Sequence, residues 1–293
     1  MDENVTKPQA DSVEVKKSTL IAVVAVIAIF IIGFYLGGAF NIGGVAPNGG
    51  DNGGSTTEES FVENTPLLVS FDDDDVMGHE GAAISIIEFS DYNCPFCGKF
   101  FKETVAPLKQ NYVNTGKVNF VHRDYPIDKL LYHENTFKYA QSTECAAEQD
   151  KFWEMHDALY QENLDFYAAL QAGENPENFT IDKIRRNAEA IGLDMDLFNT
   201  CLDTDATLDE VAADLQAGAS YGVGGTPATF IIVNKELDAA KLAELNEMGK
   251  YVWEQTGKDR KLMMTYVGSG TTTVMIGGAF PYEIFQSVLD LMA

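Results

Sequence analysis

The stretch Ile84-Ser-Ile-Ile-Glu-Phe-Ser-Asp-Tyr-Asn-Cys-Pro-Phe-Cys97 decides the fold of this chain. Its first half, Ile84 to Phe89, is a short β-branched apolar run of the kind that forms a buried strand. Polar residues break the run, and Pro95 suits a first helical turn because its missing N–H is not needed there. Beyond the proline, apolar residues recur every three to four positions, as on one face of a helix. Cys94 is therefore predicted to lie where a strand leads into a helix N-terminus, with Cys97 one turn further on.

This position gives the Cys-x-x-Cys motif a chemical meaning. The partial positive charge and free N–H groups of a helix N-terminus favour a thiolate at Cys94, and Cys97 is close enough to form a disulfide with it. Taken alone, the motif is also half of a zinc knuckle. The strand before it and the helix after it favour redox chemistry.

Several sequence blocks resemble the DsbA-like thiol–disulfide oxidoreductases of the thioredoxin superfamily. They are Phe71-Asp-Asp-Asp-Asp-Val-Met-Gly78, Ile87-Glu-Phe-Ser-Asp-Tyr-Asn-Cys-Pro-Phe-Cys97, Phe120-Val-His-Arg-Asp-Tyr-Pro126, Lys151-Phe-Trp-Glu-Met-His-Asp-Ala-Leu159 and Gly225-Thr-Pro-Ala-Thr-Phe230. The resemblance implies an α/β, thioredoxin-like fold over residues 67–293. It also implies a helical insertion at about 136–220 that caps the active site.

The resemblance assigns roles to individual residues. Cys94 is expected to be the exposed attacking sulfur and Cys97 the shielded resolving sulfur. Glu88 stands where the family keeps a buried acid that exchanges a proton with Cys97; the alternative is a glutamate exposed at a sheet edge. The Thr226–Pro227 peptide bond is expected to be cis beside the dithiol, with backbone groups of Thr226 pairing with an extended substrate.

The pair of residues between the cysteines bears on the redox potential. The strongest oxidants of this family resemble Cys-Pro-His-Cys, in which the third residue can carry a positive charge. Here Pro95 is followed by Phe96, which can neither carry charge nor donate to a thiolate. We therefore expect a pKa for Cys94 below that of a free thiol, and a disulfide less oxidising than the strongest oxidants.

Composition narrows the function further. The chain has 293 residues, 45% of them apolar, which suffices for one sizeable domain with appendages. The formal net charge of −25 argues against nucleic acid as a partner, because a phosphate backbone requires a basic surface. No metal and no cofactor are predicted.

The other two of the four cysteines are far apart in sequence. An even number of cysteines in an extracytoplasmic protein suggests two disulfides. Cys145 and Cys201 both fall in helical segments of the inserted block, and the family resemblance permits a structural disulfide between them. Two buried free thiols are the alternative.

The N-terminal region is predicted to cross a membrane. Residues 1–18 are polar, and 19–40 include an uncharged apolar run, Leu20 to Phe40, long enough to span about 30 Å as a helix. Lys16 and Lys17 flank the run on one side. The positive-inside rule then places the N-terminal tail in the cytoplasm and the remainder outside. A cleaved signal peptide is the alternative, although the run is long for one.

The remaining segments carry weaker signals. Residues 41–66 are predicted to be a flexible linker, because 41–60 are rich in Gly, Asn, Ser and Thr. Asp72 to Asp75 are interpreted as a solvated acidic turn rather than a calcium site. Thr136 to Gln161 follows one long helical pattern. An extra helical insert is expected at about 235–268, as a packed surface helix rather than a docking surface.

Three histidines, at positions 122, 133 and 156, lack metal-ligand spacing and are interpreted as surface or satisfied structural residues.

Together these features predict a membrane-anchored extracytoplasmic thiol–disulfide oxidoreductase that introduces disulfides through Cys94 and Cys97. The expected partners are reduced or unfolded extracytoplasmic proteins and a membrane redox partner that reoxidises the dithiol. A disulfide reductase or isomerase is the alternative within the enzyme class. A module that carries copper or zinc on the same thiols is the alternative outside it.

Overall fold

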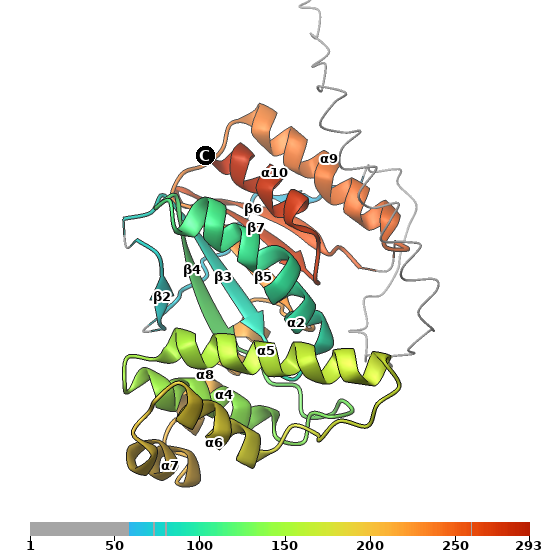
Figure 1. Cartoon of the computed structure of the whole chain (residues 1–293). Coiled ribbons are helices and arrows are strands. Elements are labelled where there is room, and N and C mark those ends of the chain that lie inside the picture. The colour runs from blue at the N-terminus through green and yellow to red at the C-terminus, as the bar shows by residue number, and fades with distance from the viewer. Residues whose placement is uncertain (1–58, 73, 80, 259) are drawn as a thin grey trace, which may run out of the picture. The chain divides into compact units, whose positions relative to one another are not determined.

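The stretch that begins at Ile84 does form a strand, β3 (Ile84–Ser90), and this strand lies inside a mixed sheet. The structure is a computed structural model, and it describes residues 59–72, 74–79, 81–258 and 260–293. Within these residues seven strands follow the order β1-β6-β7-β5-β3-β4-β2 (Figure 1). Their bounds are Val62–Glu63 (β1), Val76–Met77 (β2), Val118–Asp124 (β4), Ala228–Val233 (β5), Met263–Gly268 (β6) and Thr271–Gly277 (β7).

Strand pairing fixes which side chains share a face of the sheet. β3 pairs in parallel with β4 and antiparallel with β5, so that Glu88 lies level with His122 on one side and with Thr229 on the other. β5 and β7, and β7 and β6, pair antiparallel, and β1 adds in parallel to β6. Because partners in register point to the same face, Glu88, His122 and Thr229 form a row on one face.

One helical segment begins at the dithiol and covers the sheet. It starts as α2 (Pro95–Phe100) and continues through the π-helical turns η1 (Phe101–Val105) and η2 (Lys109–Val113), with α3 (Ala106–Leu108) between them. The C-terminal helix α10 (Tyr282–Met292) packs against η1 and α3. The buried stripe of α10 follows the three-to-four-residue spacing of its apolar residues.

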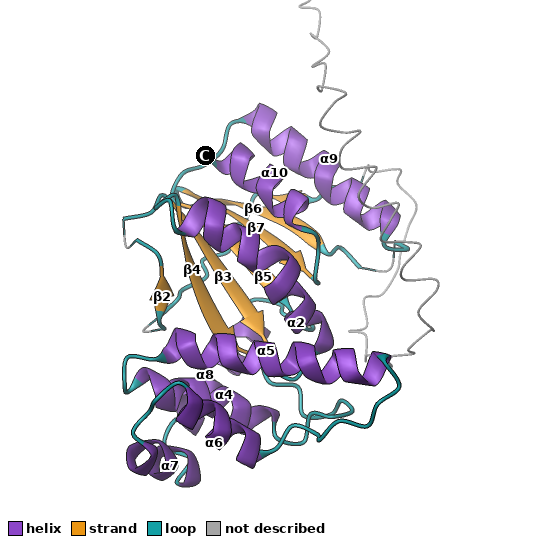
Figure 2. Ribbon diagram, viewed as in Figure 1, coloured by secondary structure: helices purple, strands orange, loops and turns teal. Residues whose placement is uncertain are grey.

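The expected helical insertion is present as five helices beyond the carboxyl ends of β3 and β4 (Figure 2). They are α4 (Thr136–Ala147), α5 (Phe152–Gln171), α6 (Ile181–Ala190), α7 (Met195–Asp203) and α8 (Leu208–Ser220). The single helical pattern predicted from Thr136 to Gln161 is in fact two helices. The break comes at residues 148–151, where Asp150 has a φ of 58° that an α-helix cannot include.

The extra insert is only partly helical, which corrects the prediction. α9 (Ala239–Gln255) forms as expected and packs on β1 and β6, with Leu245 and Val252 buried. Gly249 allows this packing, because a Cβ there would lie 2.6 Å from Cβ of Phe61. Residues 263–268, however, are the strand β6, whose identity depends on pairing with β7.

The ordered domain also begins earlier than predicted. Phe61 is buried, and Val62–Glu63 form β1, although both lie inside the expected linker of 41–66. The expected tail, the expected membrane span at 19–40 and the linker before residue 59 lie outside the described residues. In the part of the chain that is described, no helix has the length and apolar character needed to cross a bilayer.

Candidate active site

Cys94 and Cys97 lie where the sequence predicted, at the transition from strand to helix. The Cys94 N–H donates to the carbonyl oxygen of Asp91 at 3.0 Å, which closes a tight turn after β3. Cys94 itself has extended backbone angles, and Pro95 is the first residue of α2. Both cysteines are free thiols. The turn therefore directs the Cys94 sulfur to the start of the helix and the Cys97 sulfur beneath it.

The attacking sulfur is less exposed than predicted. Only 4% of Cys94 is accessible to solvent, and Cys97 is fully buried. The carbonyl oxygen of Thr226 lies 3.6 Å from the Cys94 sulfur, and both cysteines belong to the apolar core that α5 and its neighbours form. As predicted, Cys94 is more exposed than Cys97. Its sulfur is nevertheless covered by the loop that contains Thr226 and is not freely accessible to solvent.

The peptide bond between Thr226 and Pro227 is cis, as predicted. Pro227 is buried and Thr226 is half-buried at the rim of the dithiol. This places the backbone that leads into β5 directly beside Cys94, with the Pro227 carbonyl oxygen accepting from the Gly278 N–H at 2.7 Å.

The two thiols differ in acidity. The Cys97 thiol donates a hydrogen bond to Cys94, and this is the main cause that lowers the pKa of Cys94; burial and the charge of Asp91 oppose it. Contacts with Thr226 and with the backbone of Cys97 lower it further. Burial raises the pKa of Cys97 well above the usual value for a thiol. A deprotonated Cys94 beside a protonated Cys97 is the state expected of a nucleophile and its resolving partner.

Glu88 is the buried acid that the resemblance implied. It is 2% exposed, and burial raises its pKa to about 8, against a hydrogen bond from Ser90 that lowers it. The Ser90 hydroxyl in turn accepts a hydrogen bond from the Tyr160 hydroxyl at 2.7 Å. The charge of Glu88 also raises the pKa of Cys97. Glu88 therefore lies within electrostatic reach of the resolving thiol and can hold a proton near neutral pH.

The three histidines are all buried rather than on the surface. His133 is paired with Asp91 at 3.0 Å and His156 with Asp157 at 2.9 Å, so these two are satisfied. Neither ring nitrogen of His122 makes a hydrogen bond within the described residues, which contradicts the expectation for this residue. Burial lowers the pKa of His122 to about 3 and keeps the ring neutral, stacked on Tyr92 with centroids 4.8 Å apart.

An acidic turn predicted to be solvated is partly buried. Asp72 is exposed, but the Asp74 side chain is 5% exposed and forms an ion pair with Arg123 at 3.1 Å. Arg123 is also fully buried and bonds to Asp214 of α8. Carboxylate oxygens of Asp74, Glu210 and Asp214 lie within 4.8 Å of one another. Burial and the nearby charge of Asp214 raise the pKa of Asp74, while the Arg123 guanidinium works to lower it.

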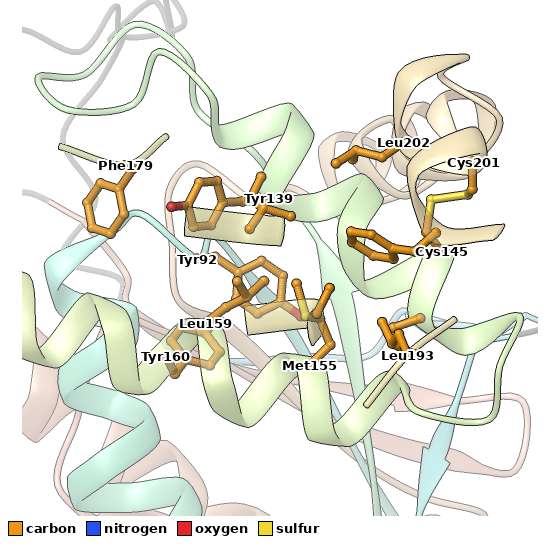
Figure 3. Packing of buried hydrophobic residues seen from close by; sticks show 14 of the residues in the cluster. Tyr92, Tyr139, Cys145, Met155, Leu159, Tyr160, Phe179, Leu193, Cys201 and Leu202 are labelled. Atoms are coloured by element: carbon orange, nitrogen blue, oxygen red, sulfur yellow. A yellow bond between two sulfur atoms is a disulfide. The ribbon is translucent and has the colours of Figure 1, made fainter. Parts of the chain in front are cut away.

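The second disulfide is present inside the helical insertion. Cys145 of α4 and Cys201 of α7 are bridged, with their Cα atoms 5.8 Å apart (Figure 3). Figure 3 also shows Tyr92, two residues after the end of β3, among the residues of α4 and α5. The turn before the dithiol is therefore anchored in the core of the insertion.

These features define a thioredoxin-fold protein with a dithiol at the start of a helix, an adjacent cis-proline and a buried acid. A family model described as Thioredoxin matches residues 71–249, which is more than half of the chain, and the chain belongs to this family. It is similar to a solved structure of α-DsbA1 from Wolbachia pipientis, with 20% identity, a TM-score of 0.54, and coverage of 77% of this chain and 93% of that one. This likeness confirms the DsbA-like fold.

Curated proteins of two kinds are among those similar to this chain. One is the probable disulfide bond formation protein D of Bacillus anthracis, 23% identical over 177 residues, which make up 59% of this chain and 78% of that protein. The other consists of Na(+)/H(+) antiporters, such as NhaA 3 of Salinispora tropica, 29% identical over 160 residues. The chain spans 22% of that antiporter's length. So small a share gives no basis for expecting antiporter activity here.

Proposed function

We propose that this protein is a thiol–disulfide oxidoreductase that introduces disulfides into reduced proteins. The observation that carries the proposal is the arrangement of the two thiols at the start of α2, where the Cys94 sulfur lies 3.6 Å from the carbonyl oxygen of Thr226 and Cys97 is fully buried one turn further on. The lowered pKa of Cys94 and the raised pKa of Cys97 agree with this arrangement. A metal-carrying module would need two thiols that are accessible together, whereas Cys97 is fully buried.

In the oxidising direction the enzyme begins with a Cys94–Cys97 disulfide. A substrate thiolate attacks the Cys94 sulfur, which forms a mixed disulfide and releases Cys97 as a thiolate. Glu88, when protonated, is placed to give that thiolate a proton. A second substrate thiolate then attacks the substrate sulfur of the mixed disulfide and releases Cys94 as a thiolate. The substrate thus loses two electrons to the dithiol, while the protons of its two thiols pass to solvent; Cys97 takes its proton from Glu88, and Cys94 remains a thiolate.

The cellular setting is part of the same proposal. The apolar run at 19–40 anchors the chain in a membrane, and the domain lies on the extracytoplasmic side, where disulfides persist. Substrates are reduced or unfolded proteins of that compartment. Repeated turnover requires a membrane partner that takes the two electrons from the reduced dithiol.

Oxidation of a reduced, unfolded model protein tests the activity and its direction. The protein with its Cys94–Cys97 disulfide should form substrate disulfides in one stoichiometric round, and Cys94→Ser should abolish the reaction. Cys97→Ser, mixed instead with a model protein that already contains a disulfide, should accumulate a mixed disulfide on Cys94, because the Cys94 thiolate attacks that disulfide and no resolving thiol follows; mass spectrometry makes the adduct visible. A protein that binds copper or zinc one-to-one and exchanges no disulfide would contradict the proposal, and one that reduces disulfides but cannot form them would reverse the direction.

A further inference from the structure

A positive charge beside Cys94 cannot come from the residue between the two cysteines, because Phe96 carries none. The loop between β4 and α4 offers another source. His133 lies in this loop, is 1% exposed, and places Nδ1 3.0 Å from Oδ2 of Asp91, three residues before Cys94. Two points decide whether it is such a source: whether both ring nitrogens of His133 are protonated, and whether the resulting positive charge interacts with the Cys94 thiol.

The hydrogen bonds around Asp91 indicate that Nδ1 of His133 is protonated. Besides His133, the Asp91 carboxylate accepts hydrogen bonds from Asn93 N at 2.9 Å, Ile127 N at 2.9 Å and the Thr136 hydroxyl at 2.5 Å. An ionised carboxylate has about four acceptor positions, and here all are occupied by donors. A carboxylate surrounded by two backbone N–H groups and a hydroxyl acts as the acceptor, so we assign the Nδ1 proton of His133 as the donor to it.

The same aspartate connects His133 to the nucleophile. Its backbone carbonyl accepts from the Cys94 N–H at 3.0 Å, so its side chain and main chain hold the loop and the dithiol turn together. The Asn93 side chain adds a bond to the carbonyl oxygen of Tyr132 at 3.3 Å. Residues 132–133 thus lie against residues 91–93, immediately before Cys94.

The charges in this cluster influence one another. Burial works to lower the pKa of His133, but the hydrogen bond and charge of Asp91, followed by the charges of Cys94 and Glu134, raise it above its usual value. The charge of Asp91 in turn raises the pKa of Cys94. A proton on His133 neutralises the aspartate that otherwise opposes the thiolate.

We propose that His133, held by Asp91, is a positioning residue that supplies the positive charge beside Cys94 which Phe96 does not supply. This inference rests on the proposed dithiol exchange and deepens it. With the imidazolium present, the Asp91–His133 pair is neutral, and the Cys94 thiolate released by substrate faces no uncompensated carboxylate. Without that proton, the buried Asp91 anion disfavours the thiolate.

His133→Asn is the test variant, because its side-chain N–H can still donate to Asp91 while it can carry no charge. We expect the thiolate fraction of Cys94, followed by ultraviolet absorbance at a fixed pH below the wild-type pKa, to fall about tenfold. The equilibrium with glutathione should shift about tenfold toward the protein disulfide, which corresponds to about 30 mV. Wild type should titrate in two coupled steps and the variant in one.

His156→Asn is the matched control. His156 is also buried and pairs with an aspartate, Asp157, at 2.9 Å, but burial lowers its pKa to about 4 and it is neutral. Its replacement should leave the thiolate titration and the potential unchanged. If His133→Asn behaves like His156→Asn, the proposal is overturned.

A second measurement does not depend on how the variant folds. Nuclear magnetic resonance of the histidine rings should give a His133 pKa that is higher in the reduced wild type than in Cys94→Ala, because the coupling is reciprocal. Equal values would also overturn the inference. Failure of the proposed function would look different, since wild type itself would then exchange no disulfide with glutathione or substrate.

Discussion

At the scale of single residues, Phe96 tests what sets the redox potential of the dithiol. Phe96 is half exposed and lies in the first turn of α2, two residues after Cys94. Its side chain has neither a charge nor a hydrogen-bond donor. Phe96→His adds a group that can do both, so the pKa of Cys94 should fall and the redox potential should rise. Thiolate absorbance titrations and glutathione equilibria measure the two effects. An unchanged or opposite shift would show that this position does not control the thiol.

Glu88 gives a second prediction at this scale, with a defined pH dependence. Its pKa is about 8 in the folded protein against 4.5 for the free side chain, so folding retains a proton that the unfolded chain loses. The fold therefore loses stability as pH rises from 4.5 to 8, by about 3 kcal/mol at pH 7. Glu88→Gln removes this dependence.

Denaturant unfolding at several pH values checks the Glu88 prediction. The variant should be more stable than wild type by about 3 kcal/mol at pH 7, with the difference vanishing as pH approaches 4.5. Reduction of its mixed disulfide by Cys97 should also be slower. A variant less stable than wild type at pH 7 would mean that Glu88 is ionised in the fold.

Which site residues the sequence could reveal depends on how local their geometry is. Cys94 and Cys97 are predictable because one strand, one turn and one helix position them, whereas the buried acid at Glu88 is predicted by the family resemblance. Asp91 was missed because three of its hydrogen-bond partners lie 36 to 45 residues further along the chain. The place of His122 opposite Glu88 is likewise not visible in the sequence, because only strand pairing establishes it.

At the scale of elements, the sequence predicts whether a segment is a helix or a strand better than it predicts where that element begins and ends. The 3.6-residue pattern identified the helices of the insertion, but it continued through the break at 148–151, since apolar spacing alone does not register a single residue with positive φ. The sequence predicts a helical insert that includes Met263–Gly268, because a short apolar run does not by itself distinguish a helix from a strand. Its pairing with β7 is what makes it a strand.

The disulfide between α4 and α7 gives the prediction for this scale. It closes a separation of 56 residues, which corresponds to about 4 kcal/mol in the chain-entropy model. The double variant Cys145→Ala/Cys201→Ala should lose roughly that much stability while keeping a titratable Cys94. Alkylation without reductant provides the direct check, because labelling of both Cys145 and Cys201 in the native protein would exclude the bridge.

At the scale of the whole molecule, two independent features favour an extracytoplasmic location for the described domain. The domain contains a structural disulfide, which persists in oxidising compartments and is rare in reducing ones. The sequence before it has two lysines, Lys16 and Lys17, ahead of an uncharged apolar run. A positive flank on that side predicts a cytoplasmic N-terminus and a domain on the opposite side.

Protease treatment of intact cells tests this topology. Because residues 41–60 are rich in Gly, Asn, Ser and Thr, cleavage there should release a fragment that begins near residue 59 and keeps its dithiol exchange, while a cytoplasmic marker protein stays intact. A cleaved signal peptide would instead give a domain that is soluble before any protease is added. A domain that stays bound and protected until the cells are lysed would place it on the cytoplasmic side, where reducing conditions oppose both the Cys145–Cys201 bridge and net disulfide formation by Cys94.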